Sequence, residues 1–325
     1  MSVARTAWRA VVLACIALFA SMPAAGADAY PSRPIRFIVP IGPGSSGDTM
    51  TRTFAEHLRK VAGQSTLVEN RPGAELSLGT QVALSAPADG YTVVLISPSA
   101  TVINPLLVKD LPYRPEDLLP MLNVTRHVAV LVASVNSPYK NLGDVVAAGR
   151  RDKGGVSLAT YGNSYRLGAL DLAKRAGVDF NHVPYKGAAQ AVADVVGGSV
   201  DLALIDIAGA APLVASGKIR ALAVAGDQRH PLLPDVATVQ ESGYPGYSLY
   251  IFIGFAIHAK TPPAIVGKLE DMMRQVMDDP ALRAQLAQQS GGEVVGIGSK
   301  EFSRQIQAEK VRYGELARTL GGELP

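Results

Sequence analysis

From Tyr30 onward, hydrophobic and polar residues follow two recurring patterns. Short apolar runs such as "IRFIVPI" at 35–41 are typical of buried strands. Between these runs, apolar residues recur three or four positions apart, as at Met50, Phe54, Leu58 and Val61, the pattern of a helix that buries one face. The alternation of the two patterns predicts an α/β fold.

The patterns form two blocks of similar content, which predicts a two-lobed protein. In the first block we expect strands at 35–41, 65–70 and 91–97, a helix that starts with Asp48 or Thr49 as its N-cap, and a helix over 75–85. In the second block we expect strands at 128–134, 155–160, 180–185 and 200–206, with helices over 167–176 and 188–196. A helical tail from Ala264 onward has no lobe of its own, and we expect it to pack on the first lobe.

The first 27 residues form a predicted secretory signal peptide. Arg5 and Arg9 precede an apolar run from Ala10 to Ala20, and residues 25–27 give an A-x-A cleavage site. The apolar run is shorter than the roughly 20 residues that a transmembrane helix needs. Cleavage after residue 27 would place the protein in the periplasm.

Composition then excludes several classes of function. Cys15, in the signal peptide, is the only cysteine of the 325 residues, so the mature chain has neither disulfides nor thiol chemistry. Removal of Arg5 and Arg9 leaves 29 basic residues against 28 acidic ones, a net charge of +1. A nucleic-acid-binding protein is expected to carry a marked basic excess.

A glycine-rich loop, "GPGSSGD" at 42–48, matches two nucleotide-binding motifs in part. It reads G-x-G-x-x-G between a strand and a helix, but Pro43 removes an amide donor and an exported protein has little access to nicotinamide cofactors. It also resembles a phosphate loop in which Asp48 replaces the lysine, and this charge would repel a polyphosphate. A less charged anion could still be held by the amides at the helix N-terminus.

No set of residues predicts catalysis. The sequence lacks G-x-S-x-G, its five histidines are scattered, and the S-x-x-K match at 137–140 has no companion motif. An exported α/β hydrolase is therefore a remote alternative.

Four loops rich in glycine and hydroxyl groups each follow a strand, at 42–48, 97–101, 160–166 and 185–190. Ligands of open α/β sheets bind at such strand ends.

The chain resembles the substrate-binding proteins of tripartite tricarboxylate transporters, the Bug or TctC family. The resemblance covers essentially the whole mature chain and is carried by the segments "YPSRPIRFIVPIGPGSSGD" at 30–48, "VENRPGA" at 68–74, "PADGYTVVL" at 87–95, "INPLL" at 103–107, "HVPYKGAAQAVADVVGGSVDLAL" at 182–204, "GKIRALAV" at 217–224 and "LPDVATVQESGYPGY" at 233–247. It implies a type II-like periplasmic binding protein with a ligand cleft between two Rossmann-like lobes. The expected lobes are 28–127 plus 252–325, and 128–251.

The resemblance also implies a set of ligand-binding residues. The first lobe would contribute Ser45, Ser46, Gly47, Ser97, Ser99 and Thr101. The second lobe would contribute Thr160, Asn163, Ser164, Tyr185, Lys186, Gly187, Ala188 and Asp206, with Arg166 as a candidate for a second carboxylate. The chain departs from the family pattern at Ser45, Gly47, Arg166 and Gln190, so the resemblance implies no particular acid.

The expected function is capture of a small organic carboxylate and its delivery to the integral-membrane subunits of a transporter. An alternative is a sensing role, in which the periplasmic domain of a sensor kinase reads the ligand-bound form. We expect a monomer that is not an enzyme, without cofactor, metal or nucleic acid.

Overall fold

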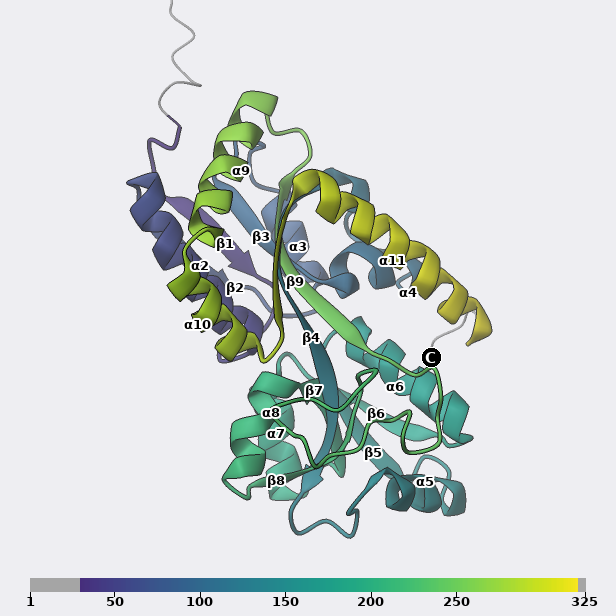
Figure 1. The fold of residues 1–325 in the computed structure, drawn as a ribbon. Helices are drawn as coiled ribbons and strands as arrows, with labels where there is room; N and C mark the ends of the chain where they lie inside the picture. The colour runs from purple at the N-terminus through teal and green to yellow at the C-terminus, as the bar shows by residue number, and fades with distance from the viewer. Residues whose placement is uncertain (1–29, 321–325) are drawn as a thin grey trace, which may run out of the picture.

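The protein has two lobes connected by two long strands (Figure 1). The structure, a computed structural model, describes residues 30–320. The predicted signal peptide, residues 1–27, lies outside the described residues. No helix within residues 30–320 is long and apolar enough to cross a membrane.

The first lobe contains a mixed sheet in the order β2-β1-β3-β9-β4, with β10 along the other edge of β4. Its N-terminal strands, parallel to one another, are β1 (Ile35–Val39), β2 (Thr66–Asn70) and β3 (Thr92–Ile96). The helical elements of this segment are α2 (Ser46–Ala62), α3 (Ser77–Leu84), the π-helix η1 (Ser99–Ile103), α4 (Asn104–Leu107) and the 3₁₀ helix η2 (Pro115–Asp117).

Two strands connect the lobes, β4 (Leu118–Ser134) and β9 (Tyr250–His258). The first part of β4 pairs with β9 as far as Val128, and its second part pairs with β7 from Ala129 onward. The sequence pattern predicted only the second part of this strand, at 128–134. A proline weakens the pattern of a strand, but tertiary pairing with β9 extends β4 past Pro120, with a register shift beside this residue.

The second lobe is built around a sheet in the order β8-β4-β7-β5-β6. Its other strands are β5 (Val156–Thr160), β6 (Phe180–Pro184), β7 (Leu202–Asp206) and β8 (Ile219–Val224). Its helices are α5 (Leu142–Arg151), α6 (Asn163–Ala176), α7 (Ala188–Gly197) and α8 (Ile207–Ala215).

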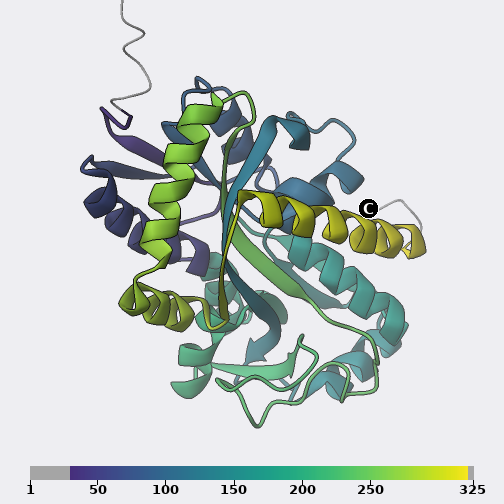
Figure 2. The ribbon, with the colours of Figure 1, turned by 45° about the horizontal axis from the view of Figure 1, so that its top comes forward.

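The C-terminal segment returns to the first lobe (Figure 2). It consists of α9 (Pro263–Met277), α10 (Pro280–Ser290), β10 (Glu293–Gly298) and α11 (Ser299–Thr319). The prediction of an all-helical tail was wrong at β10, which pairs with β4. Its short apolar run between glycines carries too little pattern to distinguish a strand from a turn.

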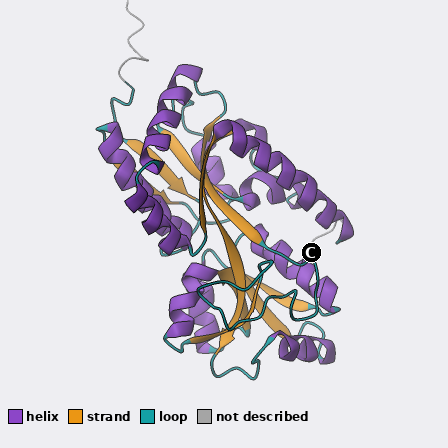
Figure 3. Cartoon of the chain, viewed as in Figure 1, coloured by secondary structure: helices purple, strands orange, loops and turns teal. Residues whose placement is uncertain are grey.

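Alternate residues of the first-lobe strands enter different cores, as the two-residue period of a strand requires. Phe37 and Val39 of β1 pack with α2, α9 and α10 on one face of the sheet. Ile38 packs with α3, η1 and α11 on the other face. Helices therefore cover both faces (Figure 3), and the second lobe has a separate core.

Gly254 of β9 lies where no larger residue fits. A Cβ atom there would overlap the carbonyl oxygen of Leu122 and come within 2.6 Å of Cε1 of Phe302. We expect Gly254→Ala to lower the free energy of unfolding by about 2 kcal/mol or more, because the backbone of β4 cannot move without breaking pairs.

The matched control is Gly267→Ala in α9, where a Cβ atom meets nothing within 4 Å. Alanine is favoured over glycine in a helix interior by roughly 0.8–1 kcal/mol, so this variant is expected to be as stable as the wild type or more stable. Urea unfolding measures both variants. Equal stability of the two would contradict the steric explanation.

Candidate functional site

A cavity of ≈ 30 Å³ lies between the two lobes. Six of the fifteen predicted site residues line it: Ser45, Ser46, Gly47, Ser97, Ser99 and Ser164. A buried water needs about 10–15 Å³ of such volume, so the cavity has room for about two water molecules.

Eight further residues line the same cavity. Five are apolar: Ile41, Leu76, Leu95, Ile251 and Ile253. The other three are His127, Tyr161 and Tyr165. None of these eight residues was predicted from the sequence to line the site. The loop at 160–166 was recognised, but its two tyrosines were passed over in favour of its small polar residues.

The N-terminus of α2 forms the first-lobe wall of the cavity. Ser45 is the N-cap, and its hydroxyl accepts from the N–H of Asp48 at 3.3 Å while it donates to the carbonyl of Gly42 at 3.1 Å. The prediction of Asp48 or Thr49 as the cap was wrong. The first turn starts within the glycine-rich loop, because Ser45 itself has the extended backbone and hydroxyl that an N-cap requires.

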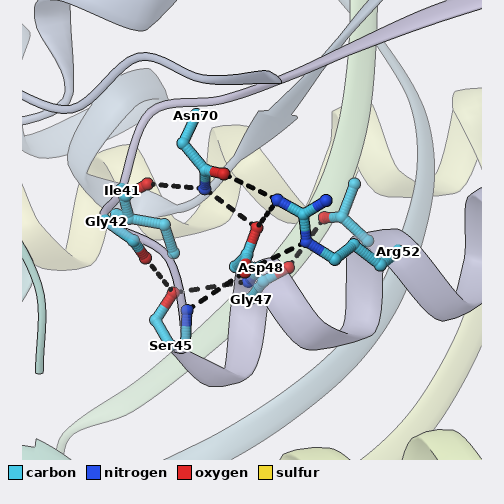
Figure 4. Close-up of polar contacts among 9 residues, drawn as sticks. Ile41, Gly42, Ser45, Gly47, Asp48, Arg52 and Asn70 are labelled. Atoms are coloured by element: carbon cyan, nitrogen blue, oxygen red, sulfur yellow. Dashed lines mark hydrogen bonds and ion pairs between the residues drawn. The ribbon is translucent and has the colours of Figure 1, made fainter. Parts of the chain in front are cut away.

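Asp48 instead secures the glycine-rich loop from inside the helix (Figure 4). The residue is 4% exposed, and its carboxylate accepts from the N–H of Gly44 at 3.1 Å and from Nδ2 of Asn70 at 2.8 Å. Arg52 donates to the same carboxylate and, at 2.7 Å, to Oδ1 of Asn70. The negative charge of Asp48, which in the sequence argued against a phosphate loop, is thus paired within the first lobe.

Two main-chain N–H groups at this helix end remain available for a ligand. Within residues 30–320, the N–H groups of Ser46 and Gly47 have no hydrogen-bond acceptor, as expected for the first residues of a helix. The first turn of α6 lies across the cavity, where Ser164 and Tyr165 line the wall. Two positive helix ends from different lobes therefore meet at the cavity.

Hydrogen bonds cross between the lobes around the cavity. The hydroxyl of Ser99 lies 2.8 Å from the hydroxyl of Ser164 and accepts from its N–H at 2.8 Å. Gly42 donates its N–H to the carbonyl of Lys186 at 2.9 Å. The backbones of these two segments approach closely here, since a Cβ atom on Gly42 would lie 3.3 Å from the carbonyl oxygen of Lys186.

Asn163 makes a further bridge between the lobes, because its Nδ2 donates to Oδ1 of Asn104 at 2.9 Å. Asn104 in turn donates to the carbonyl of Glu75 at 2.7 Å. That carbonyl belongs to a strained turn, since Ala74, Glu75 and Leu76 all have positive φ. The crossing bonds thus involve Asn163 and the backbone of Lys186, neither of which lines the cavity.

The other predicted residues have structural partners away from the cavity. Thr101 of η1 donates to the carbonyl of Ser97, which precedes this helix, and the hydroxyl of Thr160 lies 2.7 Å from Nε2 of His182. Tyr185 donates to Asp194. Gly187 packs against Gly42 and Ala188 begins α7.

Arg166 does not reach the cavity. It lines an outer groove of the second lobe together with Phe180 and His182. Burial, with a smaller contribution from the Arg166 charge, lowers the pKa of His182 to about 4. Burial also raises the pKa of Glu75, and the Arg166 charge opposes this shift. Arg166 therefore lies apart from the residues that line the cavity, and its role at a second carboxylate stays a prediction.

Asp206 lies behind the cavity wall. Its carboxylate accepts from the hydroxyl of Tyr161 at 2.8 Å and from the N–H of Gly209 at 2.8 Å, the latter as N-cap of α8. The hydroxyls of Tyr161 and Tyr165 lie 3.0 Å apart. Burial and the Asp206 charge raise the pKa of both tyrosines, which keeps them neutral.

Within residues 30–320, no group of three or more His, Cys, Asp or Glu residues is arranged to hold a metal ion. The residues that line the cavity carry hydroxyls, one imidazole and apolar side chains, and they include the first two residues of α2. This arrangement suits reversible binding of a small anion.

The paired charge of Asp48 gives a test of how the loop is held. We expect Asp48→Asn to lower the free energy of unfolding by about 1–3 kcal/mol, because an amide nitrogen would face the donors Asn70, Arg52 or Gly44. Glu56→Gln, which affects only an exposed pair with Arg59, is the control and should change little. Urea denaturation midpoints compare them, and equal effects would contradict the role of Asp48.

Comparison with known proteins places the chain in a family. A family model described as the tripartite tricarboxylate transporter family receptor, TctC, matches residues 50–321. BugT of Bordetella pertussis is 32% identical over 303 residues, which cover 92% of each chain.

Solved structures agree with this assignment. The periplasmic binding protein BugD is 30% identical over 90% of this chain and 99% of its own, with a TM-score of 0.84. Rpa4515 of R. palustris with adipate is 26% identical over 90% of this chain and 98% of its own, with a TM-score of 0.84. MatC from Rhodopseudomonas palustris with bound malate is 26% identical over 88% and 99%, with a TM-score of 0.81.

These relatives confirm the predicted two-lobed fold and the resemblance seen in the sequence. The chain therefore belongs to the tripartite tricarboxylate transporter receptor family, TctC, whose members are periplasmic binding proteins and not enzymes.

Proposed function

We propose that this protein captures a small organic carboxylate between its lobes in the periplasm and delivers it to a tripartite tricarboxylate-type membrane transporter. The observation that carries the proposal is the pair of free N–H groups of Ser46 and Gly47, two residues that line a cavity shared with the N-terminus of α6. Helix N-termini attract anions through these N–H groups and through the helix dipole. Relatives that bind adipate and malate support a carboxylate as the anion.

Neutral donors are sufficient for useful affinity. Micromolar binding corresponds to about −8 kcal/mol. Hydrogen bonds to a charged group contribute roughly 1.5–3 kcal/mol each, and a helix N-terminus adds about 0.3–1 kcal/mol. The N–H groups of Ser46 and Gly47 and the hydroxyls of Ser97, Ser99 and Ser164 are the donors that we assign to the carboxylate. Their gross contribution of roughly 8–16 kcal/mol reaches or exceeds the required free energy before the costs of ordering and lobe closure are subtracted.

Ligand entry requires the lobes to separate. A cavity with room for about two waters does not admit an organic acid, and hydrogen bonds from Ser99 and Gly42 hold the lobes together. We infer that the lobes move about the point where β4 changes partners, between Val128 and Ala129. The acid would then replace part of the contact between the lobes.

The first prediction concerns the class of ligand. The thermal-shift panel contains diacids (malate, succinate, glutarate and adipate), monoacids (butyrate, valerate and hexanoate) and the half-amides of the diacids. We expect at least one of these small carboxylates to stabilise the mature protein. A ligand at one hundred times its dissociation constant stabilises by about 2.7 kcal/mol. The methyl esters of the same acids serve as controls and should give no shift. Stabilisation by esters and acids alike would contradict carboxylate recognition.

The second prediction isolates one N–H group. Ser46 is the first residue of α2, and Ser45 before it has φ −73° and ψ 158°, a conformation compatible with a following proline. Ser46→Pro therefore removes the N–H while it preserves the helix. We expect the affinity for the best acid of the panel to fall about tenfold or more, because a hydrogen bond to a charged group is lost.

Ser46→Ala is the matched control, since it removes the hydroxyl and keeps the N–H. Its affinity should stay close to that of the wild type, and both variants should unfold at the wild-type temperature without ligand. Isothermal titration calorimetry measures the affinities. Wild-type affinity in Ser46→Pro would show that the α2 terminus does not bind the carboxylate.

A further inference from the structure

We call the part of the cavity wall formed by His127, Tyr161 and Tyr165 its far end, because these residues do not belong to α2. It has a chemistry that the carboxylate site does not use. His127, Tyr161 and Tyr165 are the polar side chains there. No lysine, arginine, aspartate or glutamate lines the cavity within residues 30–320. A second carboxylate on the ligand would therefore meet no positive side chain.

His127 faces this end of the cavity. Residues directly opposite in antiparallel strands lie on the same face of the sheet. His127 lies opposite Ile251, and Thr125 lies opposite Ile253. Both isoleucines line the cavity, so the imidazole shares their face. The side chain of His127 is 2% exposed, and its Nδ1 has no hydrogen-bond partner within residues 30–320.

Arg126 lies on the other face of β4, where its guanidinium covers the ring of Tyr250 at 3.9 Å. It therefore does not supply a positive charge to the cavity. Burial lowers the pKa of His127, and the negative charge of Asp206 opposes this shift.

Asp206 controls the direction of the tyrosine hydroxyls. It pairs with Ala129, two residues beyond His127 on the same face of β4. A hydroxyl has one proton, so the donation of Tyr161 to Asp206 leaves Tyr165 to donate to Tyr161. Both hydroxyls therefore present only lone pairs to other groups.

The fully buried carboxylate of Asp206 has no lysine or arginine as a partner within residues 30–320. The N–H of Gly209 and the hydroxyl of Tyr161 donate to it, and its charge also acts on the imidazole of His127. Its charge makes the far end of the cavity negative, in surroundings where water screens it weakly. This potential repels an anionic group and favours a hydrogen-bond donor.

We propose that the protein selects monocarboxylates whose far end carries a hydrogen-bond donor, and that His127, Tyr161 and Tyr165 accept from this donor while Asp206 orients the tyrosines. The inference rests on the proposed capture of a carboxylate at α2 and names the ligand class of that site. A hydroxyl, amide or ammonium group fits the far end, and a second carboxylate does not. His127 and the two tyrosines are specificity-determining residues, and Asp206 is a positioning residue.

The test compares diacids with their half-amides at equal chain length: succinate with succinamate, glutarate with glutaramate, and adipate with adipamate. A half-amide replaces one carboxylate by a neutral group of the same shape that donates N–H. We expect wild-type protein to bind the half-amide at least about tenfold more tightly than the diacid in isothermal titration calorimetry, because the diacid meets acceptors and a negative charge.

Asp206→Asn removes the charge and keeps a good N-cap for α8. In this variant the preference for the half-amide should fall to about threefold or less, because the repulsion of the second carboxylate is removed. Asp144→Asn is the control. Asp144 lies in the first turn of α5, outside the cavity, so the same change of net charge in the same lobe should leave the preference intact.

Tyr165→Phe provides an independent measurement if Asp206→Asn does not fold. It should weaken binding of the half-amide about fivefold or more relative to the wild type, because an acceptor for the N–H of the half-amide is lost. Wild-type affinity of Tyr165→Phe for the half-amide would overturn the inference.

Equal or tighter binding of the diacid by the wild type, or an unchanged preference in folded Asp206→Asn, would also overturn the inference and leave carboxylate capture intact. If folded wild-type protein binds none of the monoacids, diacids and half-amides, the proposed function fails, and this inference fails with it.

Discussion

One strand belongs to both lobes, and the geometry of the cleft depends on it. β4 pairs with β9 as far as Val128 and with β7 from Ala129 onward, so a single chain passes from one sheet into the other. Parallel strands of each lobe end near this crossing, and the loops after β1, β3 and β5 meet there. Ligands of α/β sheets bind at such strand ends. The cleft follows from the fact that two sheets share this strand.

The glycine-rich loop shows how a site for an anion can contain a buried acid. Asp48 neutralises its charge against Arg52 and uses its oxygens to hold Gly44 and Asn70. The helix end is thereby fixed, and Ser46 and Gly47, whose N–H groups have no acceptor within residues 30–320, stay in the cavity wall. A preorganised donor costs little ordering when the ligand arrives. The carboxylate of Asp48 therefore supports anion binding at a helix N-terminus.

The two ends of the cavity differ in electrostatic character. The α2 end offers donors and a positive helix dipole, whereas the other end offers acceptors oriented by Asp206. A cavity with opposite preferences at its two ends favours a ligand with an anion at one end and a donor at the other. Such discrimination comes from the penalty on the wrong ligand as much as from attraction of the right one.

The sequence by itself determined the α/β class, the two lobes and the family, because these follow from hydrophobic periodicity and from long family segments such as 30–48 and 182–204. It also identified the loop segments that line the cleft, and it named six residues of the cavity wall, including Ser45 and Ser164. Only the tertiary structure decided that Arg166 faces an outer groove and that His127 faces the cavity. The physical reason is that a side chain's direction depends on strand register and on where a helix begins. Neither the pairing of His127 with Ile251 nor the capping of α2 by Ser45 leaves a periodic signal in the sequence.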